Sequence, residues 1–534
     1  AIVAEDRPLH LSGEAIFRGV PLTLNFEAGT PDNLRAPTAR WPVTLSLQTP
    51  DASLTAQGTA ALQAGSRDID LQVALRGERL NALDPLLDWK MPALGPYELV
   101  GRVSTQTDGI ALNDLRAKLS DSNVAGDVIL ALTGSRKRLV GKLTSQTVRL
   151  DQFLDAINRP IGSAKPLDLS IFVTALQAVD ATMEWKAERV SLNSMAMDEV
   201  SLTARLKDGR LEVKPFAADH FGGHIVGALD IDTQGEEPTL TVEIAAHRLD
   251  VGRTLAQLTV TDRIEGIADL TLNFSSRGST FGSLLAQGTL QAAIGPSTFL
   301  LHQESYDNST SIRLITAEVS AAPSKPITLQ LKSVLRDQPL TLTAIGGPLA
   351  HLVEAPQAWP IALSAQSPTF MANVKGTVAP PWNQPGLDLA VTLKGTQLHA
   401  LSTMFPASGP YELTGQVTGA HDTYRVSRLA ARLAGSDVAG SVTLAMMAPR
   451  PRLTGTLTSK SLVLDQLVDT NPSTPVPGKP APPLDFAIPI EKLNRIDADL
   501  SWHVSSLILR AKPLGDFGLT VDLLDGRLHA APVQ

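Results

Sequence analysis

Alternation of apolar and polar residues runs through most of this chain, and it limits the possible folds more than any other feature. Successive side chains of a β-strand point to opposite faces, so a period of two predicts strands that are buried on one face only. Glycine and proline, 39 and 37 residues, punctuate the alternating segments and indicate many turns. The clearest apolar runs consist of Ile69, Leu71, Val73 and Leu75, of Val128, Leu130 and Leu132, and of Val442, Leu444 and Met446.

Strands are therefore predicted nearly throughout, mostly as antiparallel hairpins. Asp208-Gly209 and Asp525-Gly526 each stand between alternating segments, where Asp-Gly is a preferred hairpin turn. Short helices are expected only at 80–89, 150–157 and 252–258. The pattern indicates an all-β chain, but alternation by itself suits closed β-sandwiches as well as an open sheet.

The chain repeats itself over a long interval. GPYELVGRV begins at Gly95, and GPYELTGQV begins 314 residues later at Gly409. Tyr97 and Tyr411 are two of only four tyrosines, which makes the match informative. A unit of this length is a duplicated set of domains rather than a solenoid repeat. We interpret the shared positions as turns and strand starts, without chemistry of their own: Gly95, Pro96, Tyr97, Gly126, Gly409, Pro410, Tyr411 and Gly440.

The repeat and two proline-rich segments suggest how the chain is divided. Both ends are expected to be breaks in a longer protein, since the chain starts at Ala1 without a signal peptide and the second copy stops early. The predicted parts are a first copy in two regions, 1–157 and 158–250, an unduplicated β region, 251–325, a second copy, 326–470, a linker, 471–483, and a shortened last region, 484–534.

Composition excludes several classes of function. The net charge is −8 and no dense Lys/Arg block occurs, so nucleic acid is not an expected partner. No run of about 18 apolar residues is present, so no helix of this chain is expected to span a bilayer. Cysteine is absent, which weakly favours an exported chain. No cofactor is expected.

Few residues invite a chemical interpretation. His220 and His224 have the spacing of a zinc pair, but the two glycines between them favour a β-turn or bulge. The repeated tryptophans, such as Trp185 and Trp502, suit core packing better than ligand stacking. No catalytic grouping is recognisable, so an enzyme is not expected; a polysaccharide-processing enzyme would need a carboxylate pair converging in a cleft.

The repeated segments resemble the AsmA family of Gram-negative envelope proteins. The resemblance is carried by GPYEL, by SDSNVAGDV (120–128) with AGSDVAGSV (434–442), and by LTSQTVRLDQFL (143–154) with LTSKSLVLDQL (457–467). It implies a periplasmic protein anchored in the inner membrane by a segment absent from this chain and linked to outer-membrane biogenesis. The larger members resemble lipid-transfer bridges with a long, bent sheet whose concave face is apolar.

Together with the alternation, this resemblance leads us to expect a long twisted antiparallel sheet bent into a groove built from tandem repeats, with tandem β-sandwiches as the alternative. The expected function is non-enzymatic transport of phospholipid or another acyl lipid between the membranes. Exposing a 16-carbon chain to water costs about 13 kcal/mol at about 0.8 kcal/mol per methylene, and an apolar lining would remove that barrier. The alternating runs named first are the expected lining. The alternative function is a scaffold that acts on outer-membrane assembly proteins without carrying lipid.

Overall fold

Strands make up most of the part of the chain that the computed structural model describes. Thirty of these strands belong to one sheet in which antiparallel pairing predominates, and three more form a small separate sheet. The all-β prediction is confirmed. The described residues are 7–30, 40–63, 66–87, 91, 93–134, 136–153, 173, 176–258, 260–302, 309–352, 358–380, 385–397, 409–446, 450–463, 496–509 and 512–533.

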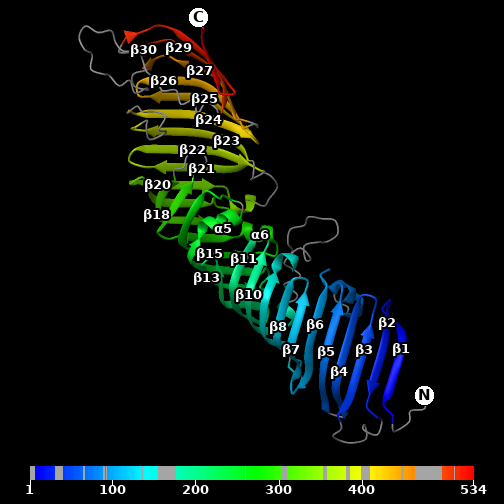
Figure 1. The fold of residues 1–534 in the computed structure, drawn as a ribbon. Coiled ribbons are helices and arrows are strands. Elements are labelled where there is room, and N and C mark those ends of the chain that lie inside the picture. The colour runs from blue at the N-terminus through cyan, green and yellow to red at the C-terminus, as the bar shows by residue number, and fades with distance from the viewer. Residues whose placement is uncertain are drawn as a thin grey trace. The chain divides into compact units, whose positions relative to one another are not determined.

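The chain divides into two compact units, Ala1–Ser311 and Ile312–Gln534. In the first unit, the first nine strands pair antiparallel with their neighbours in chain order (Figure 1). Each strand therefore needs only a connection at one end to reach its partner. These strands are β1 (Leu9–Phe17), β2 (Val20–Ala28), β3 (Trp41–Gln48), β4 (Ala52–Gln63), β5 (Ser66–Gly77), β6 (Tyr97–Gln106), β7 (Gly109–Leu119), β8 (Ser122–Ala131) and β9 (Arg138–Arg149).

The first unit continues after a crossover. The next strand pairs parallel with β9, and the strands that follow return to antiparallel order; β15 pairs with both β16 and β17. The bounds are β10 (Asp180–Leu192), β11 (Met195–Lys207), β12 (Arg210–His220), β13 (Gly223–Asp232), β14 (Thr239–Asp250), β15 (Ile264–Arg277), β16 (Thr289–Ile294) and β17 (Ser297–His302).

The second unit has the same design. Antiparallel strands follow one another to β27, which pairs parallel with β29, and β32 and β33 complete the series. Its strands are β18 (Ser309–Ala321), β19 (Thr328–Leu335), β20 (Gln338–Gly346), β21 (Trp359–Gln366), β22 (Phe370–Ala379), β23 (Gly386–Gly395), β24 (Tyr411–Ala420), β25 (Thr423–Leu433), β26 (Ser436–Ala445), β27 (Arg452–Ser459), β29 (Asp497–Val504), β32 (Phe517–Leu524) and β33 (Arg527–Val533), and the small sheet holds β28 (Leu462–Val463), β30 (Leu507–Leu509) and β31 (Lys512–Pro513).

The helices are short. Those expected near 80–89 and 252–258 are present as η1 (Leu80–Leu83) with α2 (Asp84–Leu87), and as α5 (Val251–Gln257); η2 (Leu349–Leu352) is a further single turn. Of the helix expected at 150–157, residues 150–153 are helical and the rest lies outside the described residues, as do 158–166 and 471–483. The sequence missed α6 (Phe281–Ala286), which begins at a capping box of Thr280 and Ser283. Serine in place of the usual Glu or Gln at the third helical position makes that signal weak.

Two parallel pairs, β9 with β10 and β27 with β29, interrupt the antiparallel order that the sequence predicts for most strands. At the first crossover, the Asp180 carboxylate accepts a hydrogen bond from Arg136 Nε at 2.9 Å and another from the Asp208 backbone N–H at 3.1 Å. The indole Nε1 of Trp185 on β10 also donates to Ser145 Oγ on β9 at 2.9 Å. A parallel pair lacks a hairpin to fix its register, so these side-chain bonds hold the two strands in place.

We expect Asp180→Ala to lower the free energy of unfolding by about 1–3 kcal/mol, because it leaves two donors without their acceptor. The backbone N–H of Asp208, and then Arg136, hold the pKa of the Asp180 carboxyl below its ordinary value. A depressed pKa stabilises the folded state above the unfolded-state pKa, and that contribution is lost as pH falls through the folded-state pKa. Urea titrations of the unmodified chain and of Asp180→Ala should therefore show that the difference between their free energies of unfolding becomes smaller below about pH 4.

Glu184→Ala is the matched control on the same strand. Glu184 meets Lys142 at 3.4 Å, but both side chains are more than half exposed, so its removal should cost less than about 0.5 kcal/mol. Equal losses in the two variants would contradict a special role of Asp180.

Candidate functional site

The strand register gathers the predicted apolar residues of the first unit, except Leu132, on one face. Residues opposite each other in a ladder point to the same side of a sheet. Leu71 lies opposite Val103, which lies opposite Leu112, which lies opposite Val128, so four consecutive strands share this side. We call it the apolar face. Its members on β4 to β8 include Leu54, Ala56, Ile69, Leu71, Val73, Leu75, Leu99, Val103, Leu112, Val128 and Leu130.

The second unit has an apolar face built in the same way. Val442 and Leu444 of β26 lie opposite Val426 and Tyr424 of β25 on one side, and Leu444 lies opposite Leu453 of β27 on the other. Leu132 and Met446 are placed differently from the other predicted residues. They follow the last residues of β8 and β26 and are 48% and 50% exposed, so the ladder assigns them to neither face.

The apolar face of the first unit extends well beyond the predicted residues. On β10 to β12 it includes a cluster in which Ala187, Val190, Val200 and Ala218 are buried, with Trp185 and Phe216 packed against them. The alternation in these segments is visible in the sequence. The sequence does not show that this block continues the same face, because β10 joins it by pairing with β9 across the crossover. Further members are Met183, Leu202, Val213, Leu229, Val242, Ile244, Leu272 and Phe274.

The opposite face is polar and carries ion pairs between neighbouring strands. Arg76 Nη2 lies 2.7 Å from Glu98 Oε1, and Arg210 Nε lies 3.0 Å from Asp230 Oδ2. Arg102 donates a hydrogen bond to Asp70 and holds the pKa of that carboxyl below its ordinary value. Pairs this exposed add little stability, but they keep this face wet and charged. In each unit, apolar side chains therefore lie on one face of the sheet, and polar and charged side chains lie on the other.

The apolar face is only partly shielded. Ile69, Leu71, Val73, Leu75, Val128 and Leu130 are all half-buried rather than buried. Among the described elements, the main contacts of each strand of the long sheet are with its ladder neighbours, and α5 and α6 pack on β15. No second layer of described strands packs on this face. A face of aliphatic side chains left partly open can accept an apolar ligand without displacing a packed core.

The repeated tyrosines have a structural position. Tyr97 and Tyr411 are 7% and 4% exposed, and burial raises the pKa of each phenol. Tyr97 lies opposite Gly77, and Tyr411 lies opposite Gly395. A Cβ atom added to either glycine would lie 2.4 Å from the tyrosine ring system, so the aromatic ring occupies the space above the glycine. This is the pairing in which an aromatic side chain covers a strand glycine.

The other repeated positions are also structural. Gly95 and Pro96 each accept a hydrogen bond from Ser120, through its hydroxyl and its backbone N–H, which fastens the connection before β6 to the turn after β7. Gly126 and Gly440 have φ values of 139° and 148°, which favour glycine. Gly409 and Pro410 precede β24 in the same way, and Pro410 accepts from the Ala434 N–H.

The histidine pair does not form a shared site. His220 is buried at the end of β12 with Nδ1 2.7 Å from Ala196 O, whereas His224 on β13 contacts Asp219. His220 lies opposite Gly223, and His224 lies opposite Asp219, so the two rings occupy opposite faces. Asp208 and Asp525 lie in hairpin turns, with φ of 51° and 52°. The described residues contain no group of three or more possible metal ligands.

The first unit is similar to proteins of one known family. Residues 39–294 match the model of the AsmA family. The matched segment runs from the residues before β3 to the end of β16, all within the first unit. The AsmA family protein YhjG of Escherichia coli (strain K12) is 20% identical over 308 residues. The match covers 52% of this chain and 45% of YhjG, so the chain spans less than half of that relative.

No solved structure matches the chain. None of the helices in the described part of the chain is long and apolar enough to cross a membrane.

We predict that Gly77→Ala lowers the free energy of unfolding by about 1–3 kcal/mol, because the new methyl group meets the Tyr97 ring. A double-mutant cycle with Tyr97→Ala, followed by chemical denaturation, should show that the alanine costs less once the ring is removed, with a remaining cost from the Asp51 carbonyl oxygen, which lies 2.7 Å from the same Cβ position. Gly13→Ala on β1 is the control, since nothing lies within 4 Å of a Cβ atom there. If Gly77→Ala costs as much without the ring as with it, the ring is not the cause.

Proposed function

We propose that this chain is part of an AsmA family protein of the bacterial envelope and that its apolar faces carry the acyl chains of phospholipids between the inner and outer membranes. The observation that supports this most is the apolar face itself. Register links it strand by strand through each unit, and no described second layer closes it. The family match over 39–294 supports the placement in the envelope.

The proposed mechanism is passive. Exposing an acyl chain of 16 carbons to water costs about 13 kcal/mol. Apolar protein surface that replaces the water around the chain removes this cost. Neighbouring side chains of similar size, such as Leu71, Val103 and Leu112, offer successive positions of similar free energy, so movement from one to the next needs no chemical step. We assign no catalytic residue. Anchoring in the inner membrane and exposure to the periplasm are part of the same proposal.

We further propose that the chain contains two copies of one structural unit, as the sequence repeat indicates. Several pairs of features support this, each formed once in either unit. Trp185 and Trp502 donate to Ser145 and Ser459, both at 2.9 Å, across the two parallel strand pairs. The backbone N–H groups of Asp208 and Asp525 donate to Asp180 and Asp497, both at 3.1 Å.

The interruptions of the ladder correspond as well. Asp114 in β7 and Arg428 in β25 are 314 residues apart and both have φ of 51°. Each lies in an interruption of the ladder with the following strand, between Leu112 and Leu115 and between Val426 and Leu429. Bulges bend a strand and increase its twist, so two copies with the same bulge would bend alike.

The proposed lining is tested by a charge on the apolar face. We expect Leu130→Asp to reduce transfer of a fluorescent phospholipid between donor and acceptor vesicles by about tenfold, because the carboxylate interrupts the apolar surface. Ile129→Asp is the matched control: it is the adjacent residue of β8, lies on the polar face and is 42% exposed. It should transfer at the rate of the unmodified protein.

Native mass spectrometry of the same proteins provides an independent measurement. The unmodified chain and Ile129→Asp should retain phospholipid, and Leu130→Asp should retain less. Equal transfer by both variants at equal folded concentration would refute the lining. A protein that never carries phospholipid under gentle conditions would favour the scaffold that acts without lipid.

A further inference from the structure

Two histidines lie opposite each other on the polar face of the first unit. His224 of β13 and His247 of β14 are partners in the ladder. Side chains at opposite positions of an antiparallel pair have Cβ atoms about 4.5–5.5 Å apart, so the two imidazole rings are neighbours. The sequence pairs His224 with His220, but His220 lies on the other face, and the ring beside His224 comes from the next strand instead.

Each of these rings has an aspartate on its outer side. His224 Nδ1 lies 2.7 Å from Asp219 Oδ1 on β12, and His247 Nδ1 lies 4.0 Å from Asp269 Oδ2 on β15. The backbone N–H of Arg248 donates to Asp269 Oδ1 at 2.8 Å, which holds that carboxylate beside the bulge of β14. The order across four adjacent strands is therefore aspartate, histidine, histidine, aspartate. We call Asp219, His224, His247 and Asp269 the histidine row.

Both rings direct the same nitrogen toward a carboxylate. A carboxylate can only accept a hydrogen bond, so Nδ1 of a neutral ring carries the proton and Nε2 keeps the lone pair that binds a metal ion. For His224 the 2.7 Å contact with Asp219 is such a hydrogen bond. A carboxylate on the second nitrogen is also the usual support of a metal-binding histidine, because it orients the ring and makes it more basic.

The two rings are open to solvent. The side chains of His224 and His247 are 56% and 62% exposed. A dissolved ion can therefore reach them without displacing a packed core, and the rings can rotate until both Nε2 atoms lie at the Zn–N distance of about 2.0–2.1 Å. The backbone beneath them is fixed, because both residues belong to paired strands of the long sheet.

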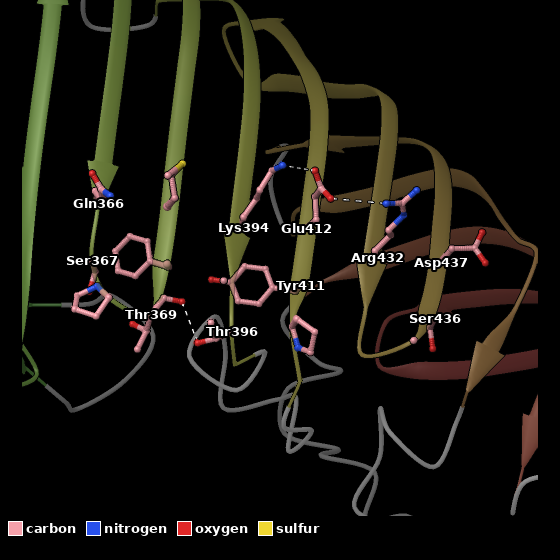
Figure 2. A pocket seen from close by; sticks show the side chains of 16 residues that line it. Gln366, Ser367, Thr369, Lys394, Thr396, Tyr411, Glu412, Arg432, Ser436 and Asp437 are labelled. Atoms are coloured by element: carbon pink, nitrogen blue, oxygen red, sulfur yellow. Dashed lines mark hydrogen bonds and ion pairs between the residues drawn. The ribbon is translucent and has the colours of Figure 1, made fainter.

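The carboxylates of the histidine row lack the partners that other carboxylates of the polar face have. In the second unit, Glu412 lies between Lys394 and Arg432 (Figure 2). Among the described residues, neither Asp219 nor Asp269 has an arginine or lysine within ion-pair distance; each has only a histidine. An imidazole is charged only when it is protonated. A cation held between the two rings would supply the positive charge that both carboxylates otherwise lack.

We propose that the histidine row binds one divalent transition-metal ion through Nε2 of His224 and Nε2 of His247. Imidazole suits Zn²⁺, Cu²⁺ and Ni²⁺, whereas Mg²⁺ and Ca²⁺ prefer oxygen ligands. Water completes the coordination, in keeping with the lack of any group of three possible ligands among the described residues. Asp219 and Asp269 are positioning residues in this site.

The bound ion would join β13 to β14 next to the bulge at Arg248. A ligand that binds the folded chain but not the unfolded one raises its stability, so the ion would act as a clamp across the ladder. The site lies on the polar face and uses none of the residues of the apolar face. It is therefore independent of lipid carriage.

The test is a calorimetric titration of the intact chain with zinc chloride, after metal has been removed with a chelator. His224→Ala and His247→Ala should each weaken the binding of Zn²⁺ at least about tenfold, and the combined variant should be no weaker than either, because residues that share one ion are not additive. Asp219→Asn should weaken binding by about tenfold while both ligands remain. Electron paramagnetic resonance of bound Cu²⁺ should show two imidazole nitrogens in the unmodified chain and one in His247→Ala.

His302→Ala is the matched control. His302 Nε2 lies 3.1 Å from Glu265 and its side chain is exposed, but it is the only histidine of β15 and β17. Its removal should leave the binding of Zn²⁺ unchanged. Thermal unfolding with the chelator present should be alike for all variants, because the substituted side chains are exposed. With Zn²⁺, the unmodified chain and His302→Ala should unfold at a higher temperature than His247→Ala.

The results that contradict the proposal are distinct from the result that supports it. Unchanged binding of Zn²⁺ by His247→Ala overturns the shared site, and so does a loss that is confined to His224→Ala. Binding of Ca²⁺ that is as tight as that of Zn²⁺ and is lost in Asp219→Asn identifies a carboxylate site and overturns the imidazole assignment. Equal weakening in both single variants and in the combined variant, with normal binding by His302→Ala, supports the histidine row.

Discussion

Register between neighbouring strands is the constraint on which the rest of this molecule depends. A slip of one residue would move an entire strand's apolar residues to the polar face, and the error would pass to the next strand. The bulge in β7 shows how side chains are kept on the same face of the sheet when one strand has an extra residue. Leu112 and Leu115 are separated by an odd number of positions, yet they lie opposite Val128 and Gly126, which share one face. The extra residue at Asp114 is absorbed locally, so the bend does not exchange the faces.

Two devices protect this register where hairpins alone are insufficient. Tyrosine rings cover Gly77 and Gly395 at strand ends, which fills a position where a strand would otherwise be weakest. Ion pairs and indole–hydroxyl bonds hold the parallel strands at both crossovers. Small residues of the apolar face, such as Ala187 and Ala218, are buried, whereas their larger neighbours remain partly exposed. Stability and an accessible apolar surface are thus provided by different residues of the same face.

Much of the fold could be predicted from the sequence, because strand alternation and Asp-Gly turns are local signals. The apolar runs of β5 and β8 are visible in the same signal. Alternation does not show where a ladder ends, and Leu132 and Met446 lie just beyond the last residues of β8 and β26. The parallel pairs could not be predicted, because Ser145 and Trp185 meet only through a crossover of some thirty residues. The ion pair of Arg76 with Glu98 was missed for a related reason. The two are ordinary surface residues in sequence and become neighbours only through the ladder.

The crossovers also have a kinetic consequence. Most antiparallel neighbours before β9 and after β10 are joined by short connections, so these hairpins can form while the rest of the chain is unfolded. The β9–β10 pair must wait for a much longer loop to close, and the same holds for β27 with β29. Folding in each unit is therefore expected to proceed through preformed antiparallel blocks that join last along a parallel seam. Until that seam forms, β9 and β10 are unpaired edges, the stage at which the chain is most open to association with other strands.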